Sequence, residues 1–421
     1  MRKYVILVDS IINMGGSQQY CRNKYLFYKN QGFKVFVISS YHGNVFITEL
    51  RKFKDDIVEN IRYSPWCFRK QEQNRVINSI LEITGELSKD DIIDCSSITT
   101  GEWGEILAQK AMCKSVIFAV DEKFDISPDE YSFLYMKLKQ GALFTTSHEI
   151  TREMFKKYID LDQSLQRSFT AACSNVIEDL PCDLIKDFIP ESKVIACFGR
   201  LDKGYVINSA KSIQNYIQEH KDTLFTVVFI GGGTKKSIYR KIQNIFECAN
   251  NAKCIITDYI FPVPRKLLAK IDACIASSGC AEACVYENVP TIYVNSITGE
   301  PVGIAAFTID IFKDDYRLSK ANGEMNDYLN QILFQNNFRE IQMPYKDNKI
   351  ETDDEVFHTF EAQYDSIMNI NNQNYYPVDT IKPFGTKQKL YAVLGTWFGI
   401  DFLSFVHLKI LHYIKCLFSR G

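Results

Sequence analysis

Residues 193–204 read KVIACFGRLDKG, an apolar run that ends in glycine and is followed by two cations three positions apart. Continuous apolar runs of this length, bounded by turn residues, are typical of strands that are buried on both faces of a parallel sheet. The next stretch, NSAKSIQNYIQEH (208–220), has helical spacing, and FTVVFIGGG (225–233) is a second buried strand that opens into glycines. The region therefore predicts the start of a strand–helix–strand series.

The same alternation continues in both directions from this stretch. Towards the C-terminus, strands are predicted in CIITDYI (254–260), ACIASS (273–278) and PTIYVN (290–295). Towards the N-terminus they are predicted in YVILV (4–8), KVFVISS (34–40), DIIDCSS (91–97), KSVIFAV (114–120) and GALFTTS (141–147). Strands that alternate with helical stretches indicate an α/β protein with parallel sheets.

Two such series in 421 residues predict two doubly wound, Rossmann-like domains that face each other across a cleft. We expect an N-terminal domain over 1–175 and a C-terminal domain over 176–345. The remainder, 346–421, is expected to be a helical tail, packed either on the N-terminal domain or on a membrane.

Composition excludes several classes of protein. The formal charge of −2 excludes a globally basic nucleic-acid binder, and no nucleic-acid partner is expected. The 13 cysteines are scattered and never form a C-x2-C pair, which favours free thiols in a reducing compartment over disulfides or zinc. The D-x-D triplet at 160–162 follows a helical stretch, and we interpret it as a surface charge pair. We therefore expect a cytoplasmic protein without a metal site.

Ligands of open parallel sheets bind beyond the carboxyl ends of the strands, so the loops at these positions are the candidate sites. They are MGGS (14–17), GRLDKG (199–204), GGG (231–233), SSGCAE (277–282) and TGEPVGI (298–304). Glycines allow close approach of a ligand, and the start of a helix offers N–H groups to an anion. Glu282 and Glu287 are candidate acceptors for sugar hydroxyls. Each loop, taken alone, is equally compatible with an ordinary turn.

In this order the segments resemble the GT-B glycosyltransferases, most nearly the bacterial polysaccharide enzymes of glycosyltransferase family 4. MGGS is similar to that family's M-G-G-[AS] loop, GRLDKG to its G-R-L…K-G segment, and FIGGG to its [IV]-V-G-x-G stretch. The similarity covers roughly residues 4–40 and 193–305.

The resemblance implies sugar transfer from a nucleotide-diphosphate sugar to a hydroxyl of a glycan or lipid-linked glycan in bacterial surface polysaccharide synthesis. It implies that the N-terminal domain (1–175) holds the acceptor and the C-terminal domain (176–345) binds the nucleotide sugar. It implies no metal and no cofactor besides the donor. Arg200 and Lys203 would stabilise the leaving diphosphate, and Asp121, near the position of a histidine common in the family, would be an acid/base. The expected donor-binding residues are Gly15, Gly16, Ser17, Gly199, Gly232, Gly233, Ser278, Gly279, Cys280, Ala281, Glu282 and Gly299.

One departure from the family leaves the reaction's stereochemistry, retaining or inverting, open. The family carries two glutamates eight positions apart; Glu282 resembles the second, and the first would fall on Cys274. A non-catalytic GT-B-like scaffold or regulator of polysaccharide assembly, and a nucleotide-sugar epimerase of the same fold, are the alternatives.

The last forty residues differ in character from the rest of the chain. Residues 382–421 hold six Lys or Arg against one Asp, interleaved with apolar stretches that are too interrupted for a spanning helix. One interpretation is a pair of closing helices. The other is an interfacial segment on anionic lipid at the inner face of the cell membrane.

Overall fold

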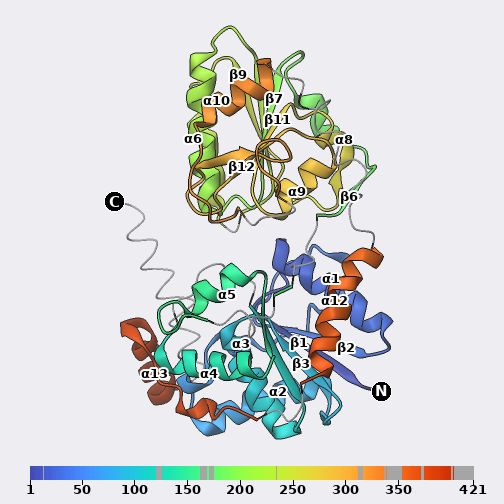
Figure 1. Cartoon of the computed structure of the whole chain (residues 1–421), viewed down its shortest axis with the longest axis vertical. Helices are drawn as coiled ribbons and strands as arrows, with labels where there is room; N and C mark the ends of the chain where they lie inside the picture. Colours follow the sequence, from blue (N-terminus) through green and yellow to red (C-terminus); the bar gives the residue numbers. More distant parts are fainter. Residues whose placement is uncertain are drawn as a thin grey trace. The chain divides into compact units, whose positions relative to one another are not determined.

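The structure, a computed structural model, describes most of the chain. The described residues are 1–12, 14–119, 126–161, 168–169, 175–233, 235–311, 316–335, 338, 353–370, 374–399 and 402. The chain forms two compact units (Figure 1). Unit 1 consists of Met1–Ile12, Tyr20–Ala172 and Asp354–Gly421, and unit 2 consists of Asn13–Gln19 and Cys173–Asp353.

Unit 1 is built on a five-stranded parallel sheet with the strand order β2-β1-β3-β4-β5. The strands are β1 (Lys3–Val8), β2 (Lys34–Ser39), β3 (Ile92–Cys95), β4 (Lys114–Ala119) and β5 (Leu143–Thr145). They are buried along nearly their whole length, which is why their sequences are continuously apolar.

Helices and short 3-10 turns cover the sheet of unit 1. The helices are α1 (Gly16–Asn30), α2 (Lys70–Thr84), α3 (Ile98–Ala111), α4 (Pro128–Lys139), α5 (His148–Phe155), α12 (Asp353–Met368) and α13 (Gly385–Phe398). The 3-10 turns are η1 (Thr48–Phe53), η2 (Glu59–Arg62), η3 (Pro65–Cys67) and η8 (Val378–Thr380). Serines at the N-caps of α3, α4 and α5 accept hydrogen bonds from the first turn of each helix.

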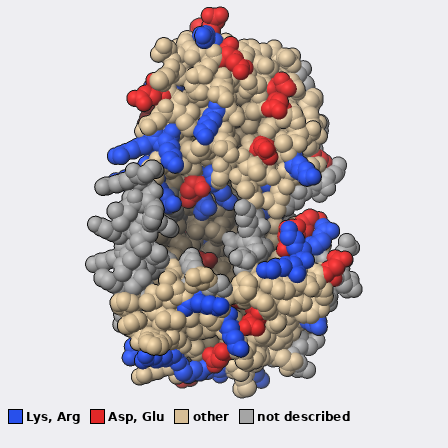
Figure 2. All heavy atoms as spheres, turned by 90° about the vertical axis from the view of Figure 1, so that its left-hand side faces the viewer, with Lys and Arg blue, Asp and Glu red and all other residues tan. Residues whose placement is uncertain are grey.

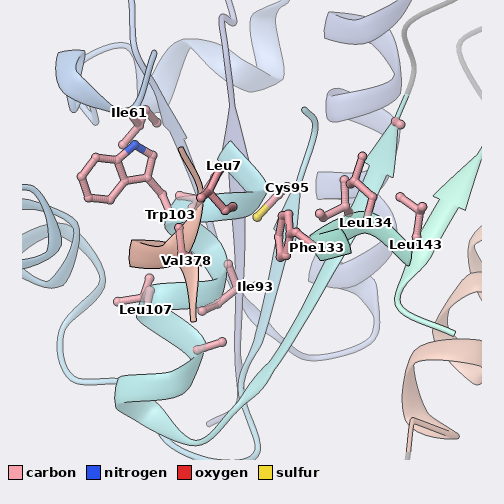
Figure 3. Packing of buried hydrophobic residues seen from close by; sticks show 14 of the residues in the cluster. Leu7, Ile61, Ile93, Cys95, Trp103, Leu107, Phe133, Leu134, Leu143 and Val378 are labelled. Carbon is pink, nitrogen blue, oxygen red and sulfur yellow. The ribbon is translucent and has the colours of Figure 1, made fainter. Parts of the chain in front are cut away.

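The core of unit 1 includes a residue from the C-terminal part of the chain. Figure 3 shows Val378 among Trp103, Leu107 and the side chains of β3. The helix α12 also belongs to this unit: the ring of Phe360 lies 5.4 Å from that of Tyr20, and the Tyr20 hydroxyl donates to Gln363 at 2.9 Å. The polar-looking stretch beyond residue 346 therefore carries a buried stripe formed by Phe360, Gln363 and Ile367.

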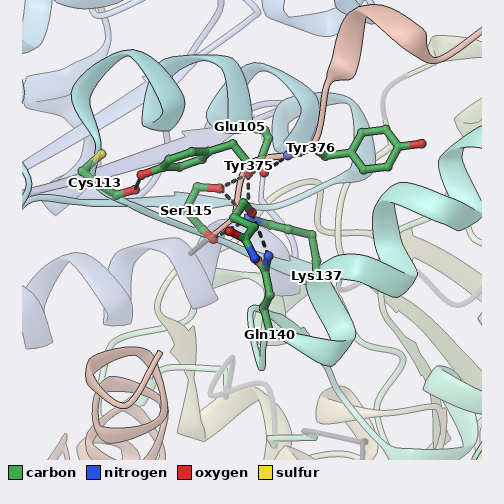
Figure 4. Close-up of polar contacts among 8 residues, drawn as sticks. Glu105, Cys113, Ser115, Lys137, Gln140, Tyr375 and Tyr376 are labelled. Carbon is green, nitrogen blue, oxygen red and sulfur yellow. Dashed lines mark hydrogen bonds and ion pairs between the residues drawn. The ribbon is translucent and has the colours of Figure 1, made fainter. Parts of the chain in front are cut away.

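A buried charge cluster attaches the same C-terminal segment to unit 1 (Figure 4). The Lys137 ammonium lies 2.7 Å from the Glu105 carboxylate and donates to the carbonyl and hydroxyl of Ser115, both at 2.8 Å. Both side chains of the ion pair are fully buried. The other oxygen of Glu105 accepts the backbone N–H of Tyr376 at 2.8 Å, and the Tyr375 hydroxyl donates to the Cys113 carbonyl at 2.9 Å.

Unit 2 contains a six-stranded sheet with the order β13-β12-β11-β7-β8-β9, in which all neighbours are parallel except β12 and β13. The strands are β7 (Lys193–Phe198), β8 (Phe225–Ile230), β9 (Ala252–Ile256), β11 (Ala273–Ala276), β12 (Thr291–Val294) and β13 (Pro301–Ile304). A two-stranded sheet pairs β6 (Ile177–Glu178) with β10 (Val263–Pro264).

Both faces of the unit 2 sheet are covered. The named helices are α6 (Gly204–Glu219), α7 (Lys236–Phe246), α8 (Arg265–Leu268), α9 (Gly279–Tyr286) and α10 (Met325–Asn330), with a 3-10 turn η5 (Asp183–Asp187) and a π-helical turn η6 (Gln331–Gln335). In β7, Ile195 and Cys197 pack with α6, α7 and α10, whereas Ala196 and Phe198 pack with α8 and α9. This alternation is the doubly wound arrangement predicted from the sequence.

The α/β prediction is confirmed, and one local expectation is corrected. The stretch 298–304, expected as a loop, contains the antiparallel edge strand β13. The contacts group 354–421 with unit 1, and the helices α12 and α13 lie in this part of the chain. Among the described residues, no helix combines the length and the apolar character needed to cross a bilayer.

Candidate functional site

The candidate site lies at the carboxyl ends of β7 and β11. The chain passes from β7 to β8 and β9 on one side and then returns to place β11 on the other side of β7. Such a reversal of strand order is the position at which open α/β sheets bind ligands, because the loops on the two sides diverge there. GRLDKG follows β7, and SSGCAE follows β11.

The loops after β7 and β8 are joined by backbone hydrogen bonds. The N–H of Leu201 donates to the carbonyl of Gly232 at 3.0 Å, and the N–H of Gly199 donates to that of Ile230 at 3.0 Å. Gly231 has a φ of 138°, and a Cβ built on it would lie 2.3 Å from the carbonyl oxygen of Gly199. The glycine at this position is therefore required by the close approach of two backbones.

The close approach of Gly231 to the Gly199 carbonyl leads to a prediction about stability. Gly231→Ala should lower the free energy of unfolding by at least about 2 kcal/mol, because the added methyl meets backbone and the φ is unfavourable. Gly233→Ala is the matched control, since its Cβ would meet the movable Ile238 side chain at 2.7 Å and its φ is not positive. Urea unfolding followed by circular dichroism measures both. Equal losses in the two variants would contradict the prediction.

Arg200 and Lys203 occupy the two ends of the β7 loop. The Arg200 side chain is 41% exposed and its Nε lies 3.4 Å from the Asp202 carboxylate. Lys203 is the N-cap of α6. The segment 13–19 belongs to unit 2, and the atom nearest to a Cβ built on Gly15 would be Cδ of Arg200 at 3.2 Å. The MGGS loop (14–17) thus lies next to Arg200, the residue predicted to bind the diphosphate.

The loop between β11 and α9 is short. Ser278 has an unusual conformation for a residue other than glycine, with a φ of 53°, and its N–H donates to the Tyr293 hydroxyl at 3.2 Å. Its carbonyl accepts the N–H groups of Ala281 and Glu282. Ser277 is buried, with only 5% of its surface exposed. Its hydroxyl has no hydrogen-bond partner among the described residues. A buried hydroxyl beside a helix N-terminus suits an anionic group.

Asn175 connects this loop to the segment 13–19. Its side-chain amide donates to the Gly279 carbonyl at 3.2 Å and to the Cys280 sulfur at 3.6 Å, and its oxygen accepts from Gln19 at 3.1 Å. The predicted residues Gly15 and Gly279–Glu282 are therefore parts of one connected region. Gly16 and Ser17 are exposed at the start of α1.

The loop 295–300 packs against the start of α6. Gly299 has a φ of 76°, and a Cβ on it would lie 3.0 Å from Cα of Tyr205. The Asn208 amide donates to the Thr298 carbonyl at 2.6 Å. Gly299 therefore lies beside the first turn of α6, the helix that follows the β7 loop.

Two expected residues need separate comment. Asp121 lies outside the described residues, as does Asp162 of the D-x-D triplet. Glu287, expected as an acceptor for a sugar hydroxyl, is instead held by Arg265, whose Nε lies 2.8 Å from it. That expectation is corrected, because the side chain is 10% exposed and already engaged.

The sequence analysis did not identify two tyrosines, Tyr239 and Tyr259, that lie beside the glycines 231–233. The Tyr239 hydroxyl donates to Asp258 at 2.6 Å and accepts the N–H of Gly233 at 2.9 Å. Burial and this carboxylate raise the pKa of Tyr239 to about 12. The Tyr259 ring covers Gly232, where a Cβ would lie 2.4 Å from it. Asp258 and Tyr259 follow the end of β9 after one residue, Thr257, so a search of the loops at the carboxyl ends of the strands could have found them.

Unit 1 has its own reversal of strand order, between β1 and β3. Asp9 directly follows β1, and the hydroxyl of Ser97, at the start of α3, donates to its carboxylate at 3.1 Å. The Ser40 hydroxyl, after β2, donates to the Asp9 carbonyl at 2.6 Å. Asp9 is an exposed carboxylate in a ligand-binding position that the sequence prediction did not include.

The residues described by the structure contain no group of three or more His, Cys, Asp or Glu arranged to hold a metal ion. No protein-family model and no curated protein sequence matches the chain.

Solved structures match the fold over nearly the whole chain. A glycosyltransferase from Rickettsia africae has a TM-score of 0.60 and 13% identity, covering 88% of this chain and 100% of that one. HepE of Anabaena, solved with UDP and glucose, has a TM-score of 0.57 and 11% identity, covering 87% and 100%. TarM of S. aureus, solved with Fondaparinux, alpha-GlcNAc-glycerol and UDP, has a TM-score of 0.56 and 10% identity, covering 88% and 100%. The protein therefore has the GT-B glycosyltransferase fold.

Proposed function

We propose that this protein is a glycosyltransferase of the family 4 type. It would transfer a sugar from a nucleotide-diphosphate sugar to a hydroxyl of a glycan or lipid-linked glycan in bacterial surface polysaccharide synthesis. One observation carries the proposal: two cations, Arg200 and Lys203, follow the strand next to the reversal of strand order, in a protein with the GT-B fold.

In this reaction the bond between the sugar's anomeric carbon and the donor's phosphate oxygen breaks, and the acceptor oxygen bonds to that carbon. The electron pair of the broken bond remains on the diphosphate. Arg200, a planar fork of donors, and Lys203, a point charge, stabilise this growing negative charge. The start of α9, with the buried Ser277 hydroxyl, supplies further donors to the phosphates.

The acceptor hydroxyl must also lose a proton, and two carboxylates are candidates to orient or accept it. Asp121 is the residue proposed from the sequence. Asp9 is the one proposed from its position at the end of β1, where Ser97 orients it. Comparing Asp9→Asn with Asp121→Asn in a transfer assay over a pH series separates them, because loss of the proton acceptor removes the low-pH limb of the rate profile.

Donor binding provides the direct test of the proposal. A ligand at about 100 times its dissociation constant stabilises the folded state by about 2.7 kcal/mol, so a screen of UDP-, GDP- and ADP-sugars by thermal unfolding identifies the donor class. Protection by a nucleotide sugar, followed by release of nucleoside diphosphate with a glycan acceptor, supports the proposal. Absence of protection by every nucleotide sugar and nucleoside diphosphate would contradict it.

Glu282 yields a prediction about binding. It lies in the first turn of α9 and is half-buried, and we assign it to the donor's ribose. Glu282→Ala should raise KM for the donor more than it lowers kcat, because a hydroxyl contact is made equally in the ground and transition states. Glu247→Ala, an exposed glutamate after α7, is the control. A large fall in kcat with unchanged KM would instead make Glu282 a participant in the chemistry.

A non-catalytic scaffold or regulator is the second candidate, and one observation favours it. Only Ser277 and Ser278 separate β11 from α9, so this connection holds no carboxylate, and Cys274 is buried within β11. Nucleotide-sugar binding without transfer or donor hydrolysis would favour this candidate over the enzyme.

A further inference from the structure

Exposed apolar side chains gather at one end of the described chain. Among the residues that the structure describes, fourteen large hydrophobic residues are exposed, and six of them lie between residues 384 and 402. They are Phe384, Leu390, Val393, Trp397, Phe398 and Phe402. Single exposed hydrophobics are normal, but a group of this kind indicates an interaction surface.

The helix α13 presents this surface while it is held firmly by unit 1. Tyr391 and Leu394 pack against the unit 1 core, and the rings of Tyr391 and Tyr63 lie 6.1 Å apart. Arg69 binds the C-terminal end of the helix, donating from Nε to the Thr396 carbonyl at 2.5 Å and from a terminal nitrogen to the Trp397 carbonyl at 3.1 Å. One face of α13 is therefore partnered.

The neighbouring face of α13 is exposed and apolar. Leu390, Val393 and Trp397 stand at positions i, i+3 and i+7, which lie on one side of a helix, and they are 54%, 48% and 74% exposed. These three side chains form what we call the outer stripe. An apolar stripe on the solvent side of an anchored helix is unfavourable unless something covers it.

Cations lie on α13, on the residues before it and on elements that contact this segment. Lys382 and Lys389 are exposed on the same segment, and Arg69 and Lys70 lie at the start of α2. Lys157 is exposed, and its ammonium nitrogen lies 5.5 Å from the centre of the Phe384 ring. Figure 2, which faces the side of the molecule bearing α13 in Figure 1, shows groups of Lys and Arg, some of them with Asp or Glu beside them.

Acidic side chains offset part of this charge, and the positive balance comes from the C-terminal sequence as a whole, in which residues 382–421 hold six Lys or Arg against one Asp. Asp379 lies 2.8 Å from the Lys70 ammonium, and Asp129 accepts the backbone N–H of Lys382. In the sequence, the following residues 403–421 add Lys409, Lys415 and Arg420 and contain no Asp or Glu. The segment is thus apolar and cationic together.

We propose that the outer stripe of α13 docks on an anionic lipid bilayer. Apolar side chains enter the boundary between headgroups and acyl chains, while the cations around them remain at the level of the negatively charged headgroups. A bilayer satisfies both properties of this surface at once. The proposal does not depend on the sugar-transfer function, because its evidence lies entirely in unit 1.

Trp397 allows the docking to be observed directly. The protein has three tryptophans; Trp103 is fully buried and Trp66 is largely buried, whereas Trp397 is 74% exposed. Quenching by acrylamide therefore reports mainly on Trp397, and Trp397→Phe identifies its share of the signal. Vesicles of phosphatidylglycerol and phosphatidylcholine should protect Trp397 and sediment with the full-length protein, and vesicles of phosphatidylcholine alone should do neither.

Two sets of variants test the two parts of the surface. Leu390→Ser/Val393→Ser/Trp397→Ser should abolish co-sedimentation, whereas Leu224→Ser/Phe307→Ser/Leu318→Ser, three exposed hydrophobics of unit 2, should retain it. Lys382→Gln/Lys389→Gln should weaken binding roughly thirtyfold, at about 1 kcal/mol per cation. Lys211→Gln/Lys221→Gln, two exposed lysines of unit 2, should not. Circular dichroism checks that each variant is folded.

Several results would overturn the proposal. Protection of Trp397 from acrylamide in a lipid-free monomer would mean that the chain's own segment covers the stripe. Protection of Trp397 in a lipid-free dimer of the unchanged protein, together with dissociation of that dimer in the triple variant, would make the stripe an interface between two copies. Full co-sedimentation of the triple variant would place the membrane contact elsewhere. Because none of these readouts involves a nucleotide sugar, failure here is distinguishable from failure of the glycosyltransferase proposal.

Discussion

Arg200→Ala and Lys203→Ala should each lower the rate of sugar transfer by about 10²–10³, which corresponds to about 2.7–4 kcal/mol of lost transition-state stabilisation. The reason is that negative charge grows on the diphosphate as the bond to the sugar breaks, and each cation interacts more strongly with that charge than with the intact donor. Transfer is measured as release of nucleoside diphosphate under saturating donor, so that a change in kcat is separated from a change in KM.

The controls for this prediction come from the same unit. Lys211→Ala removes an exposed lysine from α6, and Arg240→Ala removes an exposed arginine from α7. Both should keep near-normal rates. The unfolding transition of all four variants should remain close to that of the unchanged protein, because the Arg200 side chain is 41% exposed and Lys203 is only half-buried. Near-normal transfer by Arg200→Ala and Lys203→Ala, both folded, would remove the basis of the diphosphate assignment.

Lys137→Met should destabilise unit 1 by about 3–5 kcal/mol, because it leaves the Glu105 carboxylate buried without its cation. Ser115 would also lose the ammonium to which its carbonyl and hydroxyl are bonded. All three tryptophans of the chain, Trp66, Trp103 and Trp397, lie in unit 1, so tryptophan fluorescence during urea unfolding follows this unit specifically.

Two further variants show whether the ion pair is the cause. Lys139→Met changes an exposed lysine two positions away and should alter the free energy of unfolding by no more than about 0.5 kcal/mol. The double variant Glu105→Gln/Lys137→Met removes the stranded charge and should recover much of the loss. A loss below about 1 kcal/mol for Lys137→Met alone would show that water reaches this cluster.

The strands and the candidate loops were predictable from the sequence because both depend on local patterns. A strand buried on two faces needs an unbroken apolar run, as β7 and β8 show. A ligand loop in this fold directly follows such a run, so the positions of Gly199, Arg200 and Ser278 followed from the strand predictions.

The features that were not predicted depend on contacts between residues far apart in the sequence, which a local pattern does not reveal. The stripe of Phe360, Gln363 and Ile367 in α12 includes a buried polar residue, and its burial is explained only by Tyr20, some 340 positions earlier. Similarly, Tyr239 belongs to the site because Asp258 lies within hydrogen-bond distance, nineteen positions along the chain. Glu287 was wrongly expected as a sugar ligand because its partner, Arg265, comes from the start of a different helix.

The division of unit 1 between the two ends of the chain bears on how the protein is made. Its sheet is complete once residue 145 has been synthesised, but α12 and Val378, which cover part of it, emerge from the ribosome only after all of unit 2. During that interval the apolar surface next to Tyr20, Phe27 and Trp103 lacks its native cover. A nascent chain of this protein should therefore finish folding its middle before its beginning, and a prematurely terminated chain that ends before residue 354 should be a substrate for chaperones or proteases.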